Sequence, residues 1–265
     1  MKQRLITGFV ALALFVPFVW YGGKPFLWLV YGLAFVGLYE LVRMKQLPLF
    51  SVPTFLAAFL LAVVLLPSTV ASHEVVEVLH LTKVEITFLV VLLLLSYTVL
   101  SKNTFTFDDA SFLLMATLYV GMGFYYLNET RMEGLKYILY TLFVIWATDT
   151  GAYFIGRAIG KRKLWPEISP NKTVEGAVGG VICAVIVALV YNYFSPVADN
   201  IGMLVAVTAA VSVFGQIGDL VESAFKRHFG VKDSGNILPG HGGILDRLDS
   251  VLFVLPLLHF LHFIS

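Results

Sequence analysis

The sequence predicts an all-α polytopic integral membrane protein with about nine transmembrane helices and a cytoplasmic amino terminus. Its 265 residues are 58% hydrophobic and only 13% charged, with a mean hydropathy of +0.86. Soluble proteins contain about 45–50% apolar and about 25% charged residues, so this chain has too few polar side chains to cover a soluble surface. A single cysteine excludes a disulfide scaffold, and a net charge of +1 provides no overall attraction for nucleic acid.

The second observation is the length of the apolar runs, because a spanning helix needs about 20 mainly apolar residues. Runs of this kind cover residues 4–22, 25–43, 50–71, 84–100, 109–127, 135–156, 174–194, 201–222 and 246–264. The first run is interpreted as an uncleaved span. It is long for the apolar region of a signal peptide, and no small-residue cleavage site follows it.

The third observation is the distribution of lysine and arginine over the connections, since the side richer in them is normally cytoplasmic. Four of the 18 basic residues fall on one side, namely Lys24, Lys83, Arg131 and Lys136. The others share the side of the amino terminus: Lys2, Arg4, Arg43, Lys45, Lys102, Arg157, Lys161, Arg162, Lys163, Lys172, Lys226, Arg227, Lys232 and Arg247. We therefore expect a single transmembrane domain over 1–265, a cytoplasmic amino terminus, and functional motifs concentrated in about 146–250.

Acidic residues near the predicted spans collect in the last third of the chain, towards the cytoplasmic side. Asp149 lies in the sixth run, and Asp246 and Asp249 open the ninth. At about 100° per residue, one stripe of the eighth run carries five polar side chains. They are Gln216, Asp219, Glu222, Ser223 and Lys226. An ionisable residue within a span is energetically expensive and is by default a functional hypothesis.

Neighbouring helices that present carboxylates at the same depth favour a shared metal ion, because like charges repel unless a cation lies between them. Oxygen-only ligands suit Mg²⁺, which takes one or two carboxylates and completes its shell with phosphate oxygens. Three structural alternatives remain open. Asp246 and Asp249 can complement the dipole of a helix start, Asp219 and Glu222 can pair with the basic residues that follow them, and Asp149 can bond to backbone.

Two cytoplasmic connections, 157–173 and 223–245, are rich in glycine, proline and basic residues. The second places glycines around His241 directly before a helix start, where backbone N–H groups and the helix dipole attract anions such as phosphate. In the first, Ser169 or Thr173 can instead simply cap the next helix, with Glu175 in its first turn. Its basic run 161–163 can serve only to fix topology or to contact anionic lipid.

At this point the residues resemble a known family, the phosphatidate cytidylyltransferases, also called CDP-diacylglycerol synthases. The resemblance rests on an unbroken pattern over residues 223–249: Ser223-x-Phe225-Lys226-Arg227, then Lys232-Asp233-x-Gly235, then Leu238-Pro239-x-His241-Gly242-Gly243-Ile244-x-Asp246-Arg247-Leu248-Asp249. Residues 149–153 and 169–176 are also similar to family segments, whereas the first hundred residues match only in hydropathy.

The resemblance implies that CTP reacts with phosphatidate to give CDP-diacylglycerol and pyrophosphate, with Mg²⁺ required. It also implies a homodimer in the bilayer of the cell inner membrane, with the active site facing the cytoplasm. We assign Asp219 and Asp246 as metal ligands, with Asp249 and Asp149 as secondary candidates, and a second divalent ion as an alternative to one.

The remaining assignments follow from the same resemblance and from charge. The catalytic candidates are Asp219, Asp246, Lys226, Arg227 and His241. The substrate-binding candidates are Ser169, Asn171, Lys172, Thr173, Ser223, Lys232, Asp233, Gly242, Gly243 and Arg247. For His241, a hydrogen bond to phosphate is favoured over a packing role or general-acid catalysis.

Two other functions would also place carboxylates within a membrane protein. An ion-coupled transporter would use Asp149, Asp219 and Asp246 as a proton or ion relay. Such relays, however, usually lie near the midplane between inverted repeats, which this sequence does not show. A CDP-alcohol phosphotransferase would also combine membrane carboxylates with a cytidine nucleotide, but its spaced Asp-Gly pattern is absent.

Overall fold

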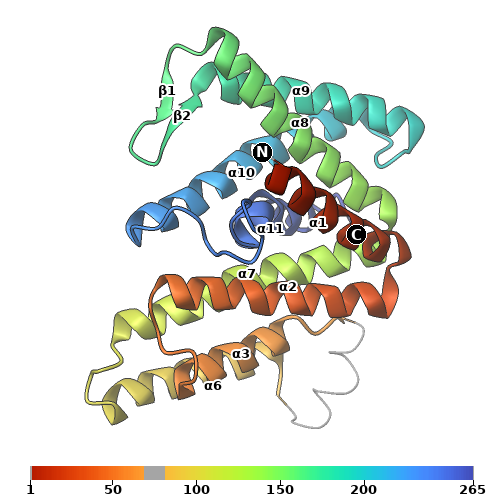
Figure 1. Cartoon of the computed structure of the whole chain (residues 1–265). Coiled ribbons are helices and arrows are strands. Elements are labelled where there is room, and N and C mark those ends of the chain that lie inside the picture. The colour runs from red at the N-terminus through yellow and green to blue at the C-terminus, as the bar shows by residue number, and fades with distance from the viewer. Residues whose placement is uncertain (1, 69–80, 265) are drawn as a thin grey trace. The chain divides into compact units, whose positions relative to one another are not determined.

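The computed structural model describes residues 2–68 and 81–264, and these residues are mostly helical (Figure 1). The helices are α1 (Lys2–Tyr21), α2 (Gly23–Met44), α3 (Val52–Val64), α6 (Lys83–Leu100), α7 (Phe107–Glu133), α8 (Leu135–Ile159), α9 (Val174–Phe194), α10 (Ile201–His228) and α11 (Leu245–Phe260). Each predicted apolar run overlaps one of them. The prediction of an all-α membrane protein is confirmed at this level.

Six of the described helices are long and apolar enough to cross a membrane: α2, α6, α7, α8, α9 and α10. The apolar parts of α1 and α3, and helix α11, are shorter than the 18 residues that this requires. The third run was expected over 50–71, but its helix begins after the N-cap Ser51 and ends at Val64. Pro67 follows closely and disfavours helix in the residue before it; residues 69–71 lie outside the described residues.

The chain forms two compact units rather than one continuous body. The first consists of Met1–Glu129 and Ser234–Ile244, and the second of Thr130–Asp233 and Leu245–Ser265. In the first unit, α2 and α6 both contact α3, and Gly121 of α7 lies against Val64 of α3. The loop 234–244 joins this unit although it lies far from α2 in sequence.

In the second unit, α8 and α9 run side by side at close range (Figure 1). A methyl group on Gly180 would lie 2.7 Å from the Thr148 carbonyl oxygen, and one on Gly151 would lie 2.7 Å from Cys183. Small residues allow membrane helices to approach this closely. The absence of a side chain at Gly151 and Gly180 therefore permits the close packing of α8 against α9.

Helices α10 and α11 also cross closely, and this crossing positions the acidic residues. A methyl group on Gly218 of α10 would lie 2.9 Å from the Asp249 carbonyl oxygen of α11. One turn away, the Ser250 hydroxyl donates to the Gly215 carbonyl oxygen at 3.0 Å. The acidic stripe of α10 and the acidic start of α11 therefore meet.

The connection between α8 and α9 contains a short hairpin that the sequence did not predict. Strands β1 (Lys163–Trp165) and β2 (Ser169–Thr173) pair antiparallel, with an irregularity between their two paired positions. Pro170 in β2 has no N–H to donate, and proline is confined to edges and irregularities of sheets.

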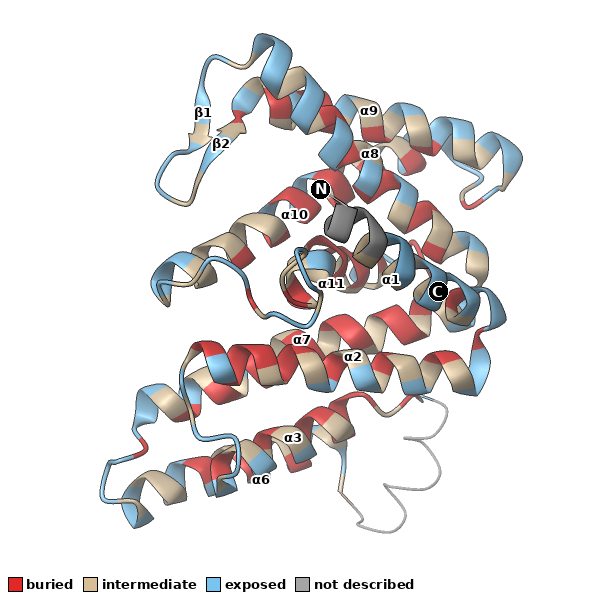
Figure 2. Cartoon of the chain, in the orientation of Figure 1, coloured by how far each residue is buried: buried red, intermediate tan, exposed pale blue. Residues whose placement is uncertain are grey.

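Exposed positions run along several helices (Figure 2), and many of them carry large apolar residues. On α9, Val178, Ile182 and Ile186 are each 55% exposed and lie at successive four-residue intervals. An apolar face this long is costly in water and suits contact with lipid or another membrane helix. The interior, in contrast, pairs its polar groups, as in the 2.7 Å hydrogen bond between Tyr140 and Thr208.

Candidate active site

Lys226 lies between two buried carboxylates from different helices. Its Nζ is 3.0 Å from Glu222 Oε2, one turn earlier on α10, and 2.6 Å from Asp246 Oδ1 on α11. The side chains of Glu222 and Asp246 are only 3% and 4% exposed, and that of Lys226 is 17% exposed. A buried charge triad of this kind is retained only where its members compensate one another.

A second ion pair joins the hairpin to α10. Lys172 Nζ of β2 lies 2.7 Å from Asp219 Oδ2, and the Ser223 hydroxyl lies 3.4 Å from Asp219 Oδ1. The sequence alternative in which Asp219 pairs with the basic residues after it is therefore wrong for Asp219, whose partner is Lys172. For Glu222 the same alternative is confirmed by its pair with Lys226.

The remaining predicted carboxylates lie in the same group. Asp149 of α8 experiences the negative charges of Asp219 and Asp249, and Asp249 in turn experiences that of Asp219. One Asp249 oxygen accepts the Ser250 N–H at 2.7 Å. Elements far apart in the sequence thus bring the predicted metal ligands of α8, α10 and α11 into one electrostatic cluster.

This cluster has a donor set that fits a hard divalent cation. Five carboxylates (Asp149, Asp219, Glu222, Asp246 and Asp249) share the ammonium groups of Lys172 and Lys226. Glu222 Oε1 is buried and accepts no hydrogen bond. Within residues 2–68 and 81–264, however, no three acidic, His or Cys side chains converge as a metal-binding group. Lysine ammonium groups lie at the carboxylates instead.

The helix-capping alternative is confirmed for Thr173. Its hydroxyl accepts the Gly176 N–H at 3.1 Å, and the residue is 7% exposed. Glu175 accepts the backbone N–H groups of Lys161 and Arg162 at 3.0 to 3.3 Å, which ties the hairpin to the start of α9. A substrate role for Thr173 stays a prediction.

The other predicted substrate-binding residues of the second unit lie around this cluster or at the surface. Arg227 donates from Nε to the Ile168 carbonyl oxygen at 3.4 Å, so α10 also contacts the hairpin. Arg227 is exposed, as are Asn171, Lys232, Asp233 and Arg247. Ser169 begins β2.

The glycine-rich loop 234–244 belongs to the first unit. The His241 N–H donates to the Leu238 carbonyl at 2.8 Å, closing a turn through Pro239 and Gly240. Gly240 has a φ of +77°, and Pro-Gly at the centre of a turn is typical of type II geometry. Gly242 also has a positive φ, +83°, and its carbonyl accepts the Leu238 N–H at 3.0 Å.

Sequence reasoning left Glu222 out of the site and missed Glu40. Glu222 was placed on the acidic stripe, and its pairing with a following basic residue was left open as a structural alternative only. Glu40 of α2 was missed entirely: it is 1% exposed and accepts hydrogen bonds from both ends of the loop 234–244. A single acid near the end of the second apolar run was the available signal.

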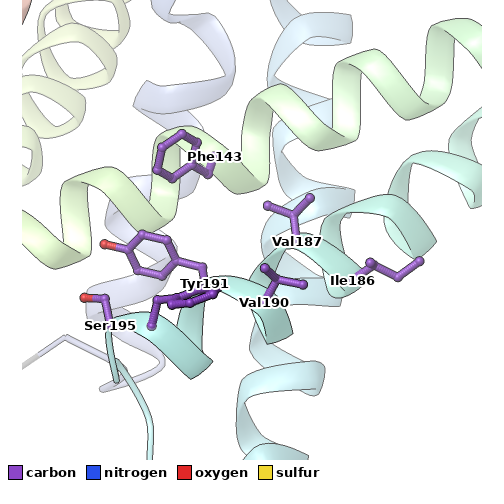
Figure 3. A pocket seen from close by; sticks show the side chains of 7 residues that line it. Phe143, Ile186, Val187, Val190, Tyr191 and Ser195 are labelled. Carbon is purple, nitrogen blue, oxygen red and sulfur yellow. The ribbon is translucent and has the colours of Figure 1, made fainter.

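An apolar pocket of about 310 Å³ lies between α8 and α9 (Figure 3). Phe143, Val187 and Tyr191 are among its lining residues, and no charged side chain lines it. It therefore lacks the groups that a polyanionic substrate would need, and the carboxylate–lysine cluster remains the candidate site.

The long apolar helices, together with a partly buried cluster of carboxylates and lysines, define a polytopic membrane protein with a charged candidate site. A family model described as the cytidylyltransferase family matches residues 2–265. The chain belongs to this family.

Curated relatives point to one activity within the family. The chain is 53% identical over 264 residues to the phosphatidate cytidylyltransferase of Bacillus subtilis (strain 168), covering 98% of this chain and 97% of the relative. It is 52% identical over 261 residues to that of Staphylococcus haemolyticus (strain JCSC1435), covering 98% of both chains. The resemblance seen in residues 223–249 is therefore confirmed.

Proposed function

We propose that this chain condenses CTP with phosphatidate to give CDP-diacylglycerol and pyrophosphate. A phosphate oxygen of phosphatidate forms a bond to the α-phosphorus of CTP, and the bond from that phosphorus to the β-phosphate bridging oxygen breaks. The observation that carries the proposal is Lys226, held between the buried carboxylates of Glu222 and Asp246. The names of those relatives supply the substrates.

The cluster suits a reaction whose difficulty is electrostatic. A phosphate monoester has a second pKa of about 6, so phosphatidate is largely ionised at neutral pH and needs no strong general base. Two polyanions must nevertheless meet, which requires positive groups that are already in place. Lys226 is held by two carboxylates and Lys172 by one, so both ammonium groups are oriented before substrate arrives.

The loop 234–244 is the second element of the proposal. In sequence it lies between the end of α10 and the start of α11, and its turn places glycines on both sides of His241, of which Gly240 is exposed. Backbone N–H groups of glycine-rich turns bind phosphate oxygens. We infer that His241 donates a hydrogen bond to phosphate, and that Arg227, Lys232 and Arg247 add positive charge around it.

The proposal includes Mg²⁺ held by Asp219 and Asp246, with Asp249 and Asp149 as secondary ligands. The support is the oxygen-only donor set, its excess of carboxylates over ammonium groups, and the buried Glu222 oxygen that accepts no hydrogen bond. When bound, such an ion neutralises charge on the transferred phosphate and on the leaving pyrophosphate. A second divalent ion is the alternative to one.

Purified protein in mixed micelles tests this function directly. With phosphatidate, Mg²⁺ and CTP labelled at the α-phosphate, we expect label in the lipid fraction, and none when the label is at the γ-phosphate. EDTA should stop the incorporation and added Mg²⁺ should restore it. Transfer of γ-label to lipid would contradict cytidylyl transfer, and the absence of any incorporation would favour a transporter.

We also propose nine membrane crossings in the cell inner membrane, with the amino terminus and the active site on the cytoplasmic side. The asymmetry of basic residues supports this orientation. The measurement is labelling of single cysteines in a Cys183→Ser background with an impermeant maleimide in intact cells. Asp199→Cys should react and Thr104→Cys should not; the reverse pattern would invert the orientation.

A homodimer completes the proposal, supported by the family resemblance and by the exposed apolar face of α9. We expect the mass of the purified protein, corrected for detergent by light scattering, to be twice 29.3 kDa. A mass of one chain at micromolar concentration would contradict it.

A further inference from the structure

Glu40 is a carboxylate near the carboxyl end of α2 that the proposed chemistry does not use. It is 1% exposed, and the residues beside it in the helix, Tyr39 and Leu41, continue an apolar run. A carboxylate in such surroundings is retained only where it makes strong hydrogen bonds. Its partners therefore indicate what it does.

The two ends of the loop 234–244, which lies in the same unit, are among those partners. Glu40 Oε1 accepts the Ile244 N–H at 2.8 Å, and Glu40 Oε2 accepts the Ser234 hydroxyl at 3.1 Å. In sequence, Ser234 lies 194 residues and Ile244 lies 204 residues after Glu40. One carboxylate therefore joins the first and the last residue of the loop 234–244.

Two glycines of the loop pack directly on this carboxylate. A methyl group on Gly235 would lie 2.6 Å from Glu40 Oε1, and one on Gly243 would collide with Glu40 and with Ser234. Gly243 is buried. Glycine at these positions is therefore explained by the close approach of the Glu40 side chain, independently of any contact with substrate.

We propose that Glu40 is a positioning residue that fixes the loop 234–244 in the conformation that binds the phosphates of CTP. This inference rests on the proposed function. Glu40 acts through the loop: its hydrogen bonds to the Ser234 hydroxyl and to the Ile244 N–H set the separation of these two residues. The turn through Pro239 and Gly240, which the His241 N–H closes, is thereby held in a fixed arrangement. Positioning of this kind affects substrate use because small displacements of a binding group are costly.

The first measurement reports the mobility of the loop 234–244 and does not depend on enzymatic activity. A nitroxide is attached at Asn236→Cys in a Cys183→Ser background, because Asn236 is exposed and Cys183 is the only native cysteine. We expect Glu40→Leu and Glu40→Asp to increase label mobility. Aspartate retains the charge but is one methylene too short, so it serves as the variant for the case in which leucine prevents folding.

Glu40→Gln is the matched conservative variant. Its amide oxygen can accept the Ile244 N–H while its NH₂ group donates to the Ser234 hydroxyl, so it should keep the loop spectrum and the activity of the parent. Glu129→Gln controls for loss of an acid elsewhere in the same unit, where Glu129 accepts the Ser68 hydroxyl at 2.7 Å. It should change neither readout.

The second measurement separates KM from kcat. For Glu40→Asp we expect the KM for CTP to rise roughly tenfold or more with a smaller change in kcat, whereas glutamine restores it. An unchanged spectrum in Glu40→Asp and Glu40→Leu would overturn the inference. So would a mobile loop combined with an unchanged KM for CTP. If the parent protein incorporated no cytidylyl group, the proposed function would fail instead, and the spectra alone would decide whether Glu40 holds the loop.

Discussion

Asp246→Asn abolishes CTP-dependent formation of CDP-diacylglycerol while the helical protein stays folded: this is the largest effect that we expect. Asp246 is 4% exposed and accepts from Lys226 Nζ at 2.6 Å. Asparagine keeps the shape but removes the charge that orients Lys226 and that the proposed Mg²⁺ ligand set requires. Loss of such electrostatic groups costs about 10²–10³ in rate, so turnover should fall by at least this factor.

The measurement is incorporation of α-labelled CTP into lipid, with circular dichroism and size exclusion as tests of folding. Asp199→Asn is the matched control, because Asp199 is exposed in the connection between α9 and α10. It should retain parental activity. Near-normal turnover of Asp246→Asn would reject a metal-binding or lysine-orienting role for Asp246.

Lys226→Met is expected to have the second largest effect, on both stability and substrate use. Removal of the lysine side chain leaves the carboxylates of Glu222 and Asp246 buried without the ammonium group between them. Breaking a buried ion pair by removing one partner typically costs about 3–5 kcal/mol. We expect a lower thermal midpoint in detergent and a higher KM for CTP.

A second substitution separates these two consequences. In Glu222→Gln with Lys226→Met, one of the uncompensated charges is gone, so the thermal midpoint should recover while CTP use stays impaired. Lys163→Met, at an exposed position of the hairpin, is the control and should change neither quantity. Recovery of both quantities in the double variant, or unchanged kinetics in Lys226→Met, would remove Lys226 from the substrate site.

Much of the fold was predictable because membrane helices depend on a local property, the length of an apolar run. The starts of helices were also local, as the cap formed by Thr173 shows. The third span was overestimated because the apolar run continues past the point where Pro67 ends helix formation. The hairpin of β1 and β2 has only eight residues in its strands, too few for an alternating pattern to be visible.

The candidate site was predictable in composition but not in pairing. Asp219, Asp246 and Lys226 could be found because α10 and α11 present them at helical spacing. Which lysine pairs with which acid depends on the hairpin, whose path the sequence did not reveal, so the contact of Lys172 with Asp219 was missed. Glu40 was missed because its partners lie about two hundred residues away in sequence.

The tight contact of α8 with α9 has a consequence for how substrates are accommodated. At Gly151 and Gly180 the two helices approach each other closely, which restricts sliding and rotation of α8 against α9. Asp149 belongs to α8, and Lys172 lies two residues before the start of α9. Under the proposed function, a lipid headgroup that contacts both residues would therefore meet a rigid pair of helices, and the conformational adjustment would fall to the lipid.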